Sequence, residues 1–468
     1  MILWTEVHRC ICFLRPACSR AATFAWMMLA LVGMCARPDL AGVTSFVRAG
    51  WLKEYCYLAL LHMFHSSAVK LDTLTALWTK LVLVLFSPLT VDGYRICVGD
   101  GIKVPKEGKK MPAVKCLHNE SENNSKGEYI MGHSFQVVSI LVTGVKNAVF
   151  AVPLISRISE GVVFSNRDKR TLLDKFVIMF TSLWPYLNCP LLLVVDAYYA
   201  CGKVIKPLLK AGHHLVTRVR SNAVGFYPAT KPKQRKRGRP KVYGKKVKLR
   251  SLFKAKEKFR SAPSPVYNER GITLQYRCVD LLWRPVGILV RFVLVIHPTR
   301  GRIILLCTDL SMDALTVIGL YGLRFKIEVS FKQAIHTLGV YAYHFWMMAM
   351  TPIKRWSGNQ HLHRKPEEYR NAVRRKIGAY HCYVQLGCIA QGILQHLAIN
   401  YPLQVWSCFR SWLRTMKTDC VPTEMVVAAA LRHSLFDFLR SSAPDQILKK
   451  MILDNADPSR MPEINMVA

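Results

Sequence analysis

The chain has 468 residues, of which 51% are hydrophobic, and a formal net charge of +37. This length exceeds one ordinary core, so we expect one large interrupted domain with helical additions, or two to three domains. The excess of 66 Lys and Arg over 29 Asp and Glu indicates a polyanionic partner.

Motifs of several other function classes are missing from the sequence. The 15 cysteines include no CxxC pair, which indicates a reduced, intracellular protein. The histidines have no zinc-ligand spacing. Neither GxxxxGK[ST] nor a strand followed by GxGxxG occurs, so we expect no nucleotide cofactor.

An apolar run at residues 21–36 is the one segment that suggests a membrane. It is shorter than the ~20 residues that a bilayer requires, so we expect a buried helix and no membrane partner. It also lies too far from a removable, A-x-A-like end to be a signal peptide. Membrane association through this run and a basic loop remains a third hypothesis for the function.

Apolar residues recur at helical spacing through the first 90 residues, for example in residues 51–62. We therefore expect residues 1–90 to be a helical region, and we assign DNA binding to it. From residue 94 onward, runs rich in Val, Ile and Phe predict strands instead. These strands are residues 95–100, 130–142 and 148–155, which short links would join as an antiparallel meander.

Helices and strands alternate in the rest of the first core segment, residues 91–220. In chain order we expect a helix at 170–187, an apolar strand at 191–196, a helix at 200–211 and a strand at 214–219. This order predicts an α/β fold in which a mixed sheet carries helices on its faces.

A strongly basic segment follows the core. Residues 231–260 hold 15 Lys or Arg and a single acid, Glu257. Three of the basic residues, Lys236, Arg237 and Arg239, belong to a sequence that resembles the minor-groove-reading core of an AT-hook. A solvated basic loop is the alternative, and contact with phosphate fits both interpretations. Strand-like runs continue to residue 307, so we expect a basic, β-rich insertion at residues 221–307.

Residues 308–350 form the second part of the predicted core, and residues 351–468 form a helical C-terminal region. Ser311 is the expected N-cap of a helix that Gly339 stops. Four polar residues of this helix recur at steps of three, four and four and share one face: Tyr321, Arg324, Glu328 and Lys332. A second stripe is expected to face the core and consists of Leu320, Leu323, Ile327 and Phe331.

Three carboxylates are the candidate catalytic residues. Asp100 and Asp196 follow apolar strand-like runs, and Glu328 lies on the helix that is expected to pack against the same sheet. Two divalent cations about 4 Å apart promote attack on a phosphodiester, and such hard cations bind oxygen ligands. We therefore expect these three residues to bind two Mg²⁺ or Mn²⁺ ions. An Asp after a strand is also common as a turn or helix cap, which is how we interpret Asp92, Asp309 and Asp313.

A family resemblance extends this interpretation. The segments Val98-Gly-Asp100-Gly-Ile-Lys-Val-Pro, Leu193-Val-Val-Asp196-Ala-Tyr-Tyr and Tyr321-x-x-Arg324-x-x-x-Glu328 resemble the DDE transposases of bacterial insertion sequences, in the group with a Tyr-Arg-Glu-Lys signature. The resemblance covers residues 94 to about 353. It implies a ribonuclease-H-like core with a β-strand insertion between the second Asp and the Glu, which are 132 residues apart here.

The resemblance also implies roles for single residues. Asp100, Asp196 and Glu328 would bind the metal ions, while Tyr321 and Arg324 would hold the DNA backbone near the cleavage point. The signature lysine usually follows the Glu by seven residues, but this chain has Ile335 there. Lys332, four residues after Glu328, is on the same helix face and is the available substitute.

The sequence thus predicts a DNA transposase that nicks the ends of a mobile element by metal-dependent hydrolysis and joins the freed 3′ hydroxyl to target DNA. Strand joining requires two ends held together, so we expect a homodimer in a synaptic complex and a cytoplasmic, nucleoid-associated location. The alternative is a non-catalytic, sequence-specific DNA-binding protein. In that case the carboxylates are structural, and Lys236, Arg237 and Arg239 make the functional contacts.

Overall fold

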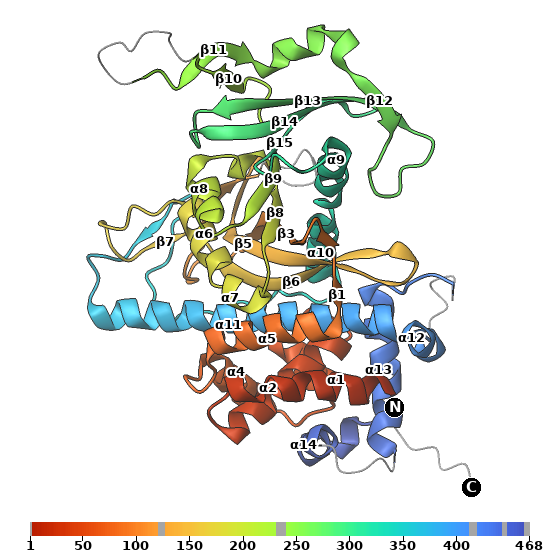
Figure 1. The fold of residues 1–468 in the computed structure, drawn as a ribbon. Helices are drawn as coiled ribbons and strands as arrows, with labels where there is room; N and C mark the ends of the chain where they lie inside the picture. The colour runs from red at the N-terminus through yellow and green to blue at the C-terminus, as the bar shows by residue number, and fades with distance from the viewer. Residues whose placement is uncertain (1, 120–126, 231–239, 411–418, 442–446, 463–468) are drawn as a thin grey trace.

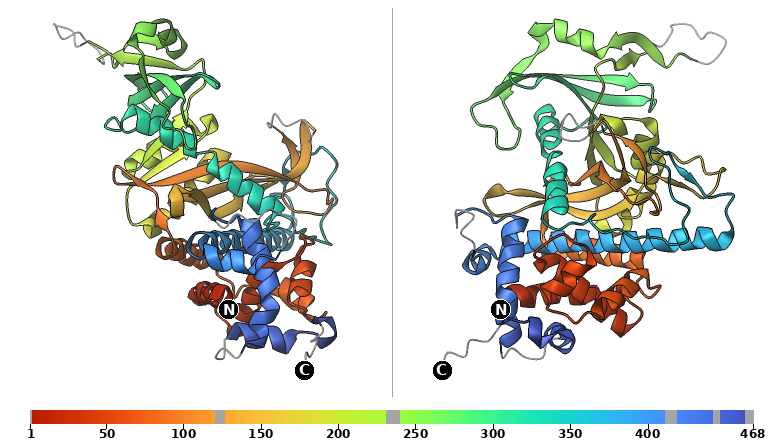
Figure 2. Two further views of the ribbon diagram at one scale, coloured as in Figure 1. Left: turned by 90° about the vertical axis from the view of Figure 1, so that its right-hand side faces the viewer. Right: turned by 180° about the vertical axis from the view of Figure 1, so that it is seen from behind.

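The computed structural model describes residues 2–119, 127–230, 240–410, 419–441 and 447–462. Three layers are visible in Figure 1: a helical layer at the bottom, a β-sheet with its helices in the middle, and further strands at the top. Figure 2 shows from two other sides that the uppermost strands extend away from the helical layer.

The N-terminal region is helical, as predicted. Its helices are α1 (Ile2–Phe13), α2 (Ala21–Ala36), α3 (Val43–Ala49), α4 (Cys56–His65) and α5 (Leu71–Leu85). The apolar run at residues 21–36 is α2, which is buried from Met27 to Ala36. It is therefore a core helix, as its length indicated.

The C-terminal region is also helical and shares a core with the N-terminal helices. It contains α11 (Glu367–Asn400), α12 (Pro402–Cys408), α13 (Glu424–Arg440) and α14 (Ile447–Asn455). The long helix α11 contacts α2, α4 and α5 on one side and the sheet on the other. It has the length and apolar composition of a membrane span, but its most apolar window is 100% buried inside the protein.

The middle layer begins with the predicted meander. The strands β3 (Tyr94–Pro105), β5 (Tyr129–Thr143) and β6 (Val149–Ile158) pair antiparallel in the order β3-β5-β6. On its other edge β3 pairs in parallel with β8 (Leu191–Val195), which pairs in parallel with β9 (His214–Arg218). All five residues of β8 are buried, as expected for a parallel strand covered on both faces.

Helices cover this part of the sheet. They are α6 (Leu172–Thr181), α7 (Trp184–Leu187) and α8 (Gly202–Lys210). The single helix predicted at residues 170–187 was wrong, because the chain breaks it at Ser182 and Leu183. Pro185 lies in the first turn of α7, where its missing N–H leaves no helical hydrogen bond unmade.

The upper strands continue the same sheet. They are β10 (Val224–Pro228), β11 (Tyr243–Lys248), β12 (Arg260–Pro263), β13 (Thr273–Trp283), β14 (Ile288–His297) and β15 (Gly301–Cys307). The strand β15 pairs antiparallel with β9. The region expected as an insertion therefore joins the core sheet through its last strand. Short strands complete the described sheets: β1 (Ser87–Pro88), β2 (Thr90–Val91), β4 (Lys115–His118), β7 (Val162–Val163) and β16 (Gln360–His361).

The single helix expected after residue 311 was wrong, because the chain forms two helices, α9 (Ala314–Leu323) and α10 (Lys326–His336), divided by a tightened turn at Arg324 and Phe325. The N-cap of α9 is Asp313, whose carboxylate accepts hydrogen bonds from the amides of Leu315 and Thr316. The prediction of Ser311 as N-cap was wrong, because its hydroxyl donates to Asp309 instead. The apolar stripe faces the core as predicted: Leu320 and Ile327 are buried, and Leu323 and Phe331 pack beside them.

Candidate active site

Asp100 and Asp196 lie side by side on neighbouring parallel strands. The register of β3 and β8 places Val98 opposite Val194, and each aspartate follows its valine by two residues. Because side chains alternate along a strand, Asp100 lies on the face of Val98. Asp196 continues β8 in extended backbone, with φ −78° and ψ 179°, and lies on the face of Val194. Both carboxylates therefore belong to one face of the sheet.

The expectation that both aspartates follow strand ends was right for Asp196 and wrong for Asp100. The strand β8 ends at Val195, but β3 continues to Pro105. Beyond the end of β8, β3 remains paired with β5, with Asp100 opposite Val137. Asp100 therefore lies inside a strand, just past the point where its pairing with β8 ends.

Asp196 also has a local structural role. Its carboxylate accepts a hydrogen bond of 2.9 Å from the amide of Tyr198 and caps the short turn at residues 197–199. Its backbone carbonyl accepts a bond of 2.6 Å from the hydroxyl of Thr217 on β9. The cap and the strand pairing orient the carboxylate without enclosing it, because Asp196 is only partly buried.

Glu328 reaches this face of the sheet on α10. Packing of Ile327 against Val98 and Val194 in one apolar cluster brings the helix to the sheet. On the opposite side, the amide of Gln391 in α11 donates to the carbonyl of Ser330 at 2.9 Å and to its hydroxyl at 3.0 Å. The helix is thus held between the sheet and α11, and the side chain of Glu328 remains 53% exposed.

Arg324 joins the helix to the sheet. Its guanidinium donates to Asp100 Oδ2 at 3.0 Å and to Glu328 Oε1 at 2.5 Å. The side chains of Arg324 and Asp100 are 18% and 19% exposed, so this ion pair is largely shielded from solvent. Asp100 also accepts a bond of 2.8 Å from the amide of Gly101. One cation therefore bridges two of the three candidate carboxylates.

The pKa of Asp100 is shifted by burial and by the charged groups around it. Burial raises the pKa of Asp100 to about 6, while the Arg324 guanidinium opposes the increase, and the Asp196 and Glu328 carboxylates add to it. Asp100 is thus close enough to both other acids for their charge to act on it. Added positive charge would stabilise its ionised form beside these two carboxylates, which is the property of a cation site.

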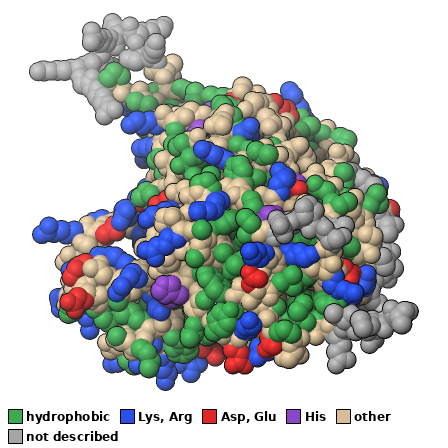
Figure 3. Space-filling model, turned by 90° about the horizontal axis from the view of Figure 1, so that it is seen from below, with side chains coloured by type: hydrophobic (Ala, Val, Ile, Leu, Met, Phe, Trp, Pro, Cys, Tyr) green, Lys and Arg blue, Asp and Glu red, His purple; other side chains and the backbone are tan. Residues whose placement is uncertain are grey.

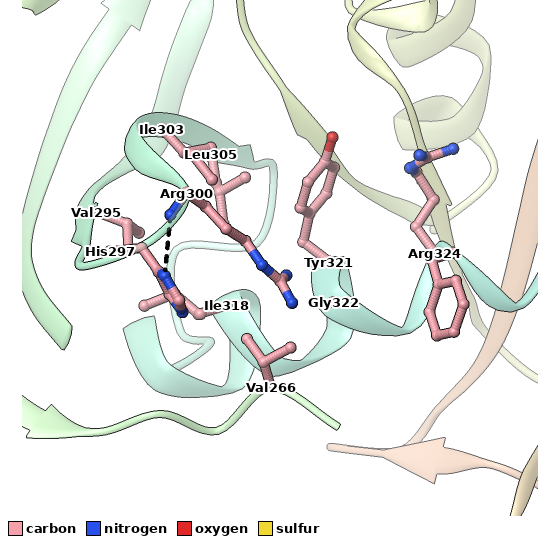
Figure 4. Close-up of a pocket in the computed structure, with 11 residues that line it drawn as sticks. Val266, Val295, His297, Arg300, Ile303, Leu305, Ile318, Tyr321, Gly322 and Arg324 are labelled. Atoms are coloured by element: carbon pink, nitrogen blue, oxygen red, sulfur yellow. Dashed lines mark hydrogen bonds between the residues drawn. The ribbon is translucent and has the colours of Figure 1, made fainter. Parts of the chain in front are cut away.

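Tyr321 and Arg324 project from the same side of the helix (Figure 4). Burial raises the pKa of the Tyr321 phenol, Arg324 and Arg218 lower it, and Asp196 raises it further. The phenol thus lies among these charged groups. Tyr321 and Arg324 also line one side of a cavity of about 150 Å³ between the helix and the strands β14 and β15.

The sequence did not indicate the polar group in this cavity. Arg300 pairs with Glu269 at 2.6 Å, and Glu269 lies 3.0 Å from the ring of buried His297. Figure 4 shows Arg300 and His297 beside Tyr321. Glu269, His297 and Arg300 are distant in the sequence from the candidate acids, and no regular spacing relates the two groups.

The remaining predicted residues differ in position. Lys332 is exposed on α10 and makes no ion pair within the described part of the chain. Ile335, at the usual lysine position, is partly buried and packs against the hydrophobic core. Lys236, Arg237 and Arg239 lie outside the described residues.

The donor set fits hard divalent cations. Carboxylate oxygens are the ligands that Mg²⁺ and Mn²⁺ prefer. Among the described residues, the ligand atoms of Glu6, Cys10 and His396 lie within 4.8 Å of one another, whereas those of Asp100, Asp196 and Glu328 are more widely spaced. Arg324 occupies the space between Asp100 and Glu328, so its displacement would let the acids converge on metal ions.

The Glu6 group itself is a buried hydrogen-bond network. Glu6 accepts from Arg9 and lies 2.7 Å from Nε2 of His396, whose Nδ1 faces the side-chain amide of Asn400 at 2.9 Å. The amide donates to Nδ1, so the ring proton is on Nε2 and points at Glu6. Burial raises the pKa of the Cys10 thiol to about 12. These hydrogen bonds join α1 to α11 around three side chains, those of Glu6, Cys10 and His396, whose ligand atoms lie within 4.8 Å of one another.

Three acids at one face of a mixed sheet in such a basic chain are typical of one class of protein, the metal-dependent nucleases. The sequence matches the family described as DDE superfamily endonuclease over residues 13–273, more than half of the chain, and the protein belongs to that family. No curated protein matches the sequence at a significant level. Enzymes of this superfamily use divalent metal ions, and an endonuclease of this kind acts on DNA.

The family match confirms two expectations from the sequence. The chain is of the DDE transposase and endonuclease type, and its mixed sheet with flanking helices is consistent with the ribonuclease-H-like fold of that type. The matched segment contains Asp100 and Asp196 but ends before Glu328. The position of Glu328 beside the two aspartates is therefore known from the tertiary structure.

Proposed function

We propose that the protein is a DNA transposase that cleaves DNA at the ends of a mobile element and joins them to target DNA. The observation that carries the proposal is the bridge from Asp100 through Arg324 to Glu328, which brings the helix acid to the two strand acids. Asp100, Asp196 and Glu328 would hold two Mg²⁺ or Mn²⁺ ions. Such ions stabilise the attacking and leaving oxygens of the phosphodiester when bound.

The other residues of the helix face would hold DNA. Arg324 is the cation nearest to the acids, and its planar guanidinium suits bidentate contact with a phosphate. Arg324 now pairs with Asp100 and Glu328, and if metal ions took its place beside these acids, its guanidinium would be free to contact the DNA backbone. The Tyr321 hydroxyl, beside Arg324 and Asp196, would donate to the same backbone. Lys332, exposed further along α10, would contact phosphate at longer range.

The wider surface supports a polyanionic ligand. On the face seen in Figure 3, Lys and Arg side chains are spread over much of the surface, and acidic side chains occur in fewer places. This agrees with a net charge of +37. A homodimer in the synaptic complex and a cytoplasmic, nucleoid-associated location belong to the same proposal, because strand joining requires two DNA ends in one complex.

The test uses a supercoiled plasmid that carries the DNA flanking the gene on both sides. We expect the protein to nick this plasmid in Mg²⁺ and to join the cut ends to a second DNA, and we expect Asp196→Ala and Glu328→Ala to abolish both steps. Asp280→Asn is the matched control, because it removes a partly buried acid that pairs with Arg291 at 2.9 Å outside the site.

The outcomes separate transposase from the alternatives. If the protein nicks the plasmid but does not join the cut ends to a second DNA, it is an endonuclease and not a transposase. DNA binding that survives every acid substitution, with no cleavage by the wild-type protein, would support the non-catalytic DNA-binding protein. Cleavage retained in Asp196→Ala or Glu328→Ala would overturn the assignment of the acids.

A further inference from the structure

A buried tyrosine lies behind the two aspartates. Tyr199 ends the short turn that Asp196 begins, and it is 1% exposed. Its ring centroid is 4.6 Å from that of Phe176 on α6. Its hydroxyl donates a hydrogen bond to Oε1 of Gln136, which is 4% exposed on β5. Asp100 and Asp196 both raise the pKa of the Tyr199 phenol, after the larger effect of its burial, so the phenol lies near both carboxylates.

Gln136 links this tyrosine to the strand that carries Asp100. It is directly opposite Gly101 in the pairing of β5 with β3. A Cβ atom at Gly101 would lie 3.0 Å from Nε2 of Gln136, so the glycine leaves room for the amide. The amide of Gly101 in turn donates to Asp100 at 2.8 Å. A continuous path thus leads from the Asp196 turn through Tyr199 and Gln136 to the backbone of Asp100.

The two aspartates are not joined by backbone pairing between their own strands. The register of β3 with β8 ends at Val98 opposite Val194, two residues before either acid. Asp196 follows the last residue of β8. Asp100 is still in β3, and its strand partner at this position is Val137 of β5. The Tyr199–Gln136 bond therefore spans the place where the ladder between the two strands has stopped.

Phe176 completes the support. A Cβ atom at Gly99 would lie 2.6 Å from Cζ of Phe176, so the ring rests directly on the backbone just before Asp100. The same ring packs against Tyr199. Removal of the tyrosine hydroxyl alone would leave this packing in place and would delete only the polar link to Gln136.

We propose that the hydrogen bond from Tyr199 to Gln136 sets the separation of the Asp196 and Asp100 carboxylates and thereby the affinity for divalent metal ions. Tyr199 is a positioning residue, because it lies behind the acids and touches neither metal nor DNA. The inference rests on the proposed function of the two aspartates as metal ligands. Outer partners of metal ligands typically change metal affinity by about 10- to 100-fold when they are removed.

The first experiment measures Mn²⁺ binding to the full chain by electron paramagnetic resonance, without DNA. Asp100→Asn defines the binding that does not depend on the site. We expect Tyr199→Phe to weaken the site-dependent binding by about 10- to 100-fold. The matched control is Tyr341→Phe, which removes another buried hydroxyl, 3.2 Å from Ser156 Oγ. The control should retain wild-type affinity and show a similar decrease in melting temperature.

A double variant distinguishes positioning from general support of the fold. Replacing both buried partners by apolar groups, in Tyr199→Phe with Gln136→Met, removes the unsatisfied amide and should restore thermal stability. We expect Mn²⁺ affinity to stay as weak as in Tyr199→Phe. Recovery of affinity together with stability would overturn the proposal, because the residue would then act only through folding.

The outcome also separates this inference from the proposed function. If the wild-type protein and Asp100→Asn bind Mn²⁺ equally, the aspartates are not metal ligands and the proposed function fails. If the wild-type protein shows site-dependent binding and Tyr199→Phe matches it, the proposed function stands and the positioning role of Tyr199 is wrong. The Mg²⁺ concentration for half-maximal nicking should follow the same order among the variants.

Discussion

Arg324 and Asp100 form a hydrogen bond of 3.0 Å although 224 residues separate them in the chain. The same guanidinium pairs with Glu328, four residues further along the helix. A cation between the partly buried Asp100 and the exposed Glu328 reduces the repulsion between the two acids, so Arg324 serves as an internal counter-ion for the site. Any divalent ion that binds these acids competes with it, and any phosphate that binds Arg324 removes it from the acids.

Replacement of Arg324 should therefore change metal and DNA binding in opposite directions. In Arg324→Ala we expect site-dependent Mn²⁺ affinity without DNA to increase, because the competing cation is gone, while nicking falls by about 10²-fold through loss of a charged phosphate contact. Electron paramagnetic resonance and plasmid nicking measure the two effects. Arg291→Ala, which breaks a comparable Asp–Arg pair outside the site, is the control. Metal affinity that drops in Arg324→Ala would contradict the counter-ion role.

Stability should depend on pH through Asp100. Its pKa is raised from 3.8 to about 6 in the folded protein. The folded state therefore binds this proton more tightly than the unfolded state, and the stabilisation is complete below pH 4 and lost as the pH rises through about 6. We expect the melting temperature of the wild-type protein minus that of Asp100→Asn to fall across this range in metal-free buffer. A difference that rises with pH would show that the site does not repel the charge on Asp100.

Metal binding should show the opposite dependence on pH. Protonation of Asp100 below about pH 6 competes with the cation, so Mn²⁺ affinity is expected to fall as the pH drops through this value. Titrations at pH 5.5 and 7.5 in otherwise identical buffer check this. Equal affinity at both values would indicate that Asp100 is not a ligand.

The exposed lysines of β11 should contact DNA phosphate. Lys245 and Lys246 are exposed on this strand, which is part of the basic segment at residues 231–260. We expect replacement of both by Gln to weaken DNA binding regardless of sequence and to lower the slope of log affinity against log salt by about 2. Lys53→Gln with Lys450→Gln is the matched control, because these exposed lysines lie at the opposite end of the molecule, by α14 (Figure 1). Equal salt slopes for the two double variants would place the DNA elsewhere.

The Glu6 network should act in stability alone. Glu6→Gln removes the acceptor of Arg9 and the partner of His396 and is expected to lower the free energy of unfolding by about 1–3 kcal/mol. Thermal melts of the wild-type protein with a chelator and with added Zn²⁺ should agree, because the Glu6 carboxylate is already paired with Arg9 and His396. A rise in melting temperature with Zn²⁺ that is absent in Glu6→Gln would identify a metal site.

Local signals in the sequence predicted several elements well. The apolar run at residues 191–195 is a buried parallel strand because Leu and Val can pack on both faces. The run at residues 21–36 is a buried helix. The stripe from Leu320 to Phe331 faces the core at the expected helical spacing. Each of these patterns extends over one element, so the neighbouring residues alone contain the information.

Competition between neighbouring groups caused the local errors. Ser311 and Asp313 are both good N-caps, and the chain uses Asp313 because Ser311 donates to Asp309. A β-run that contains Asp100 was expected to end there, but pairing with β5 carries the strand on to Pro105. A partner strand outside the segment decides such an end, which is why an apolar run alone could not show it.

The sequence by itself determined the elements, the excess of basic charge and the three acids with their helical neighbours Tyr321 and Arg324, because these depend on residue type and spacing along the chain. Only the tertiary structure decided that Asp100 and Asp196 follow opposite residues of two paired strands. It also decided that Arg324 bridges Asp100 to Glu328 and that Tyr199 donates a hydrogen bond to Gln136. These relationships depend on strand pairing and side-chain packing between segments that are distant in the chain, and no local pattern encodes the distance between two such segments.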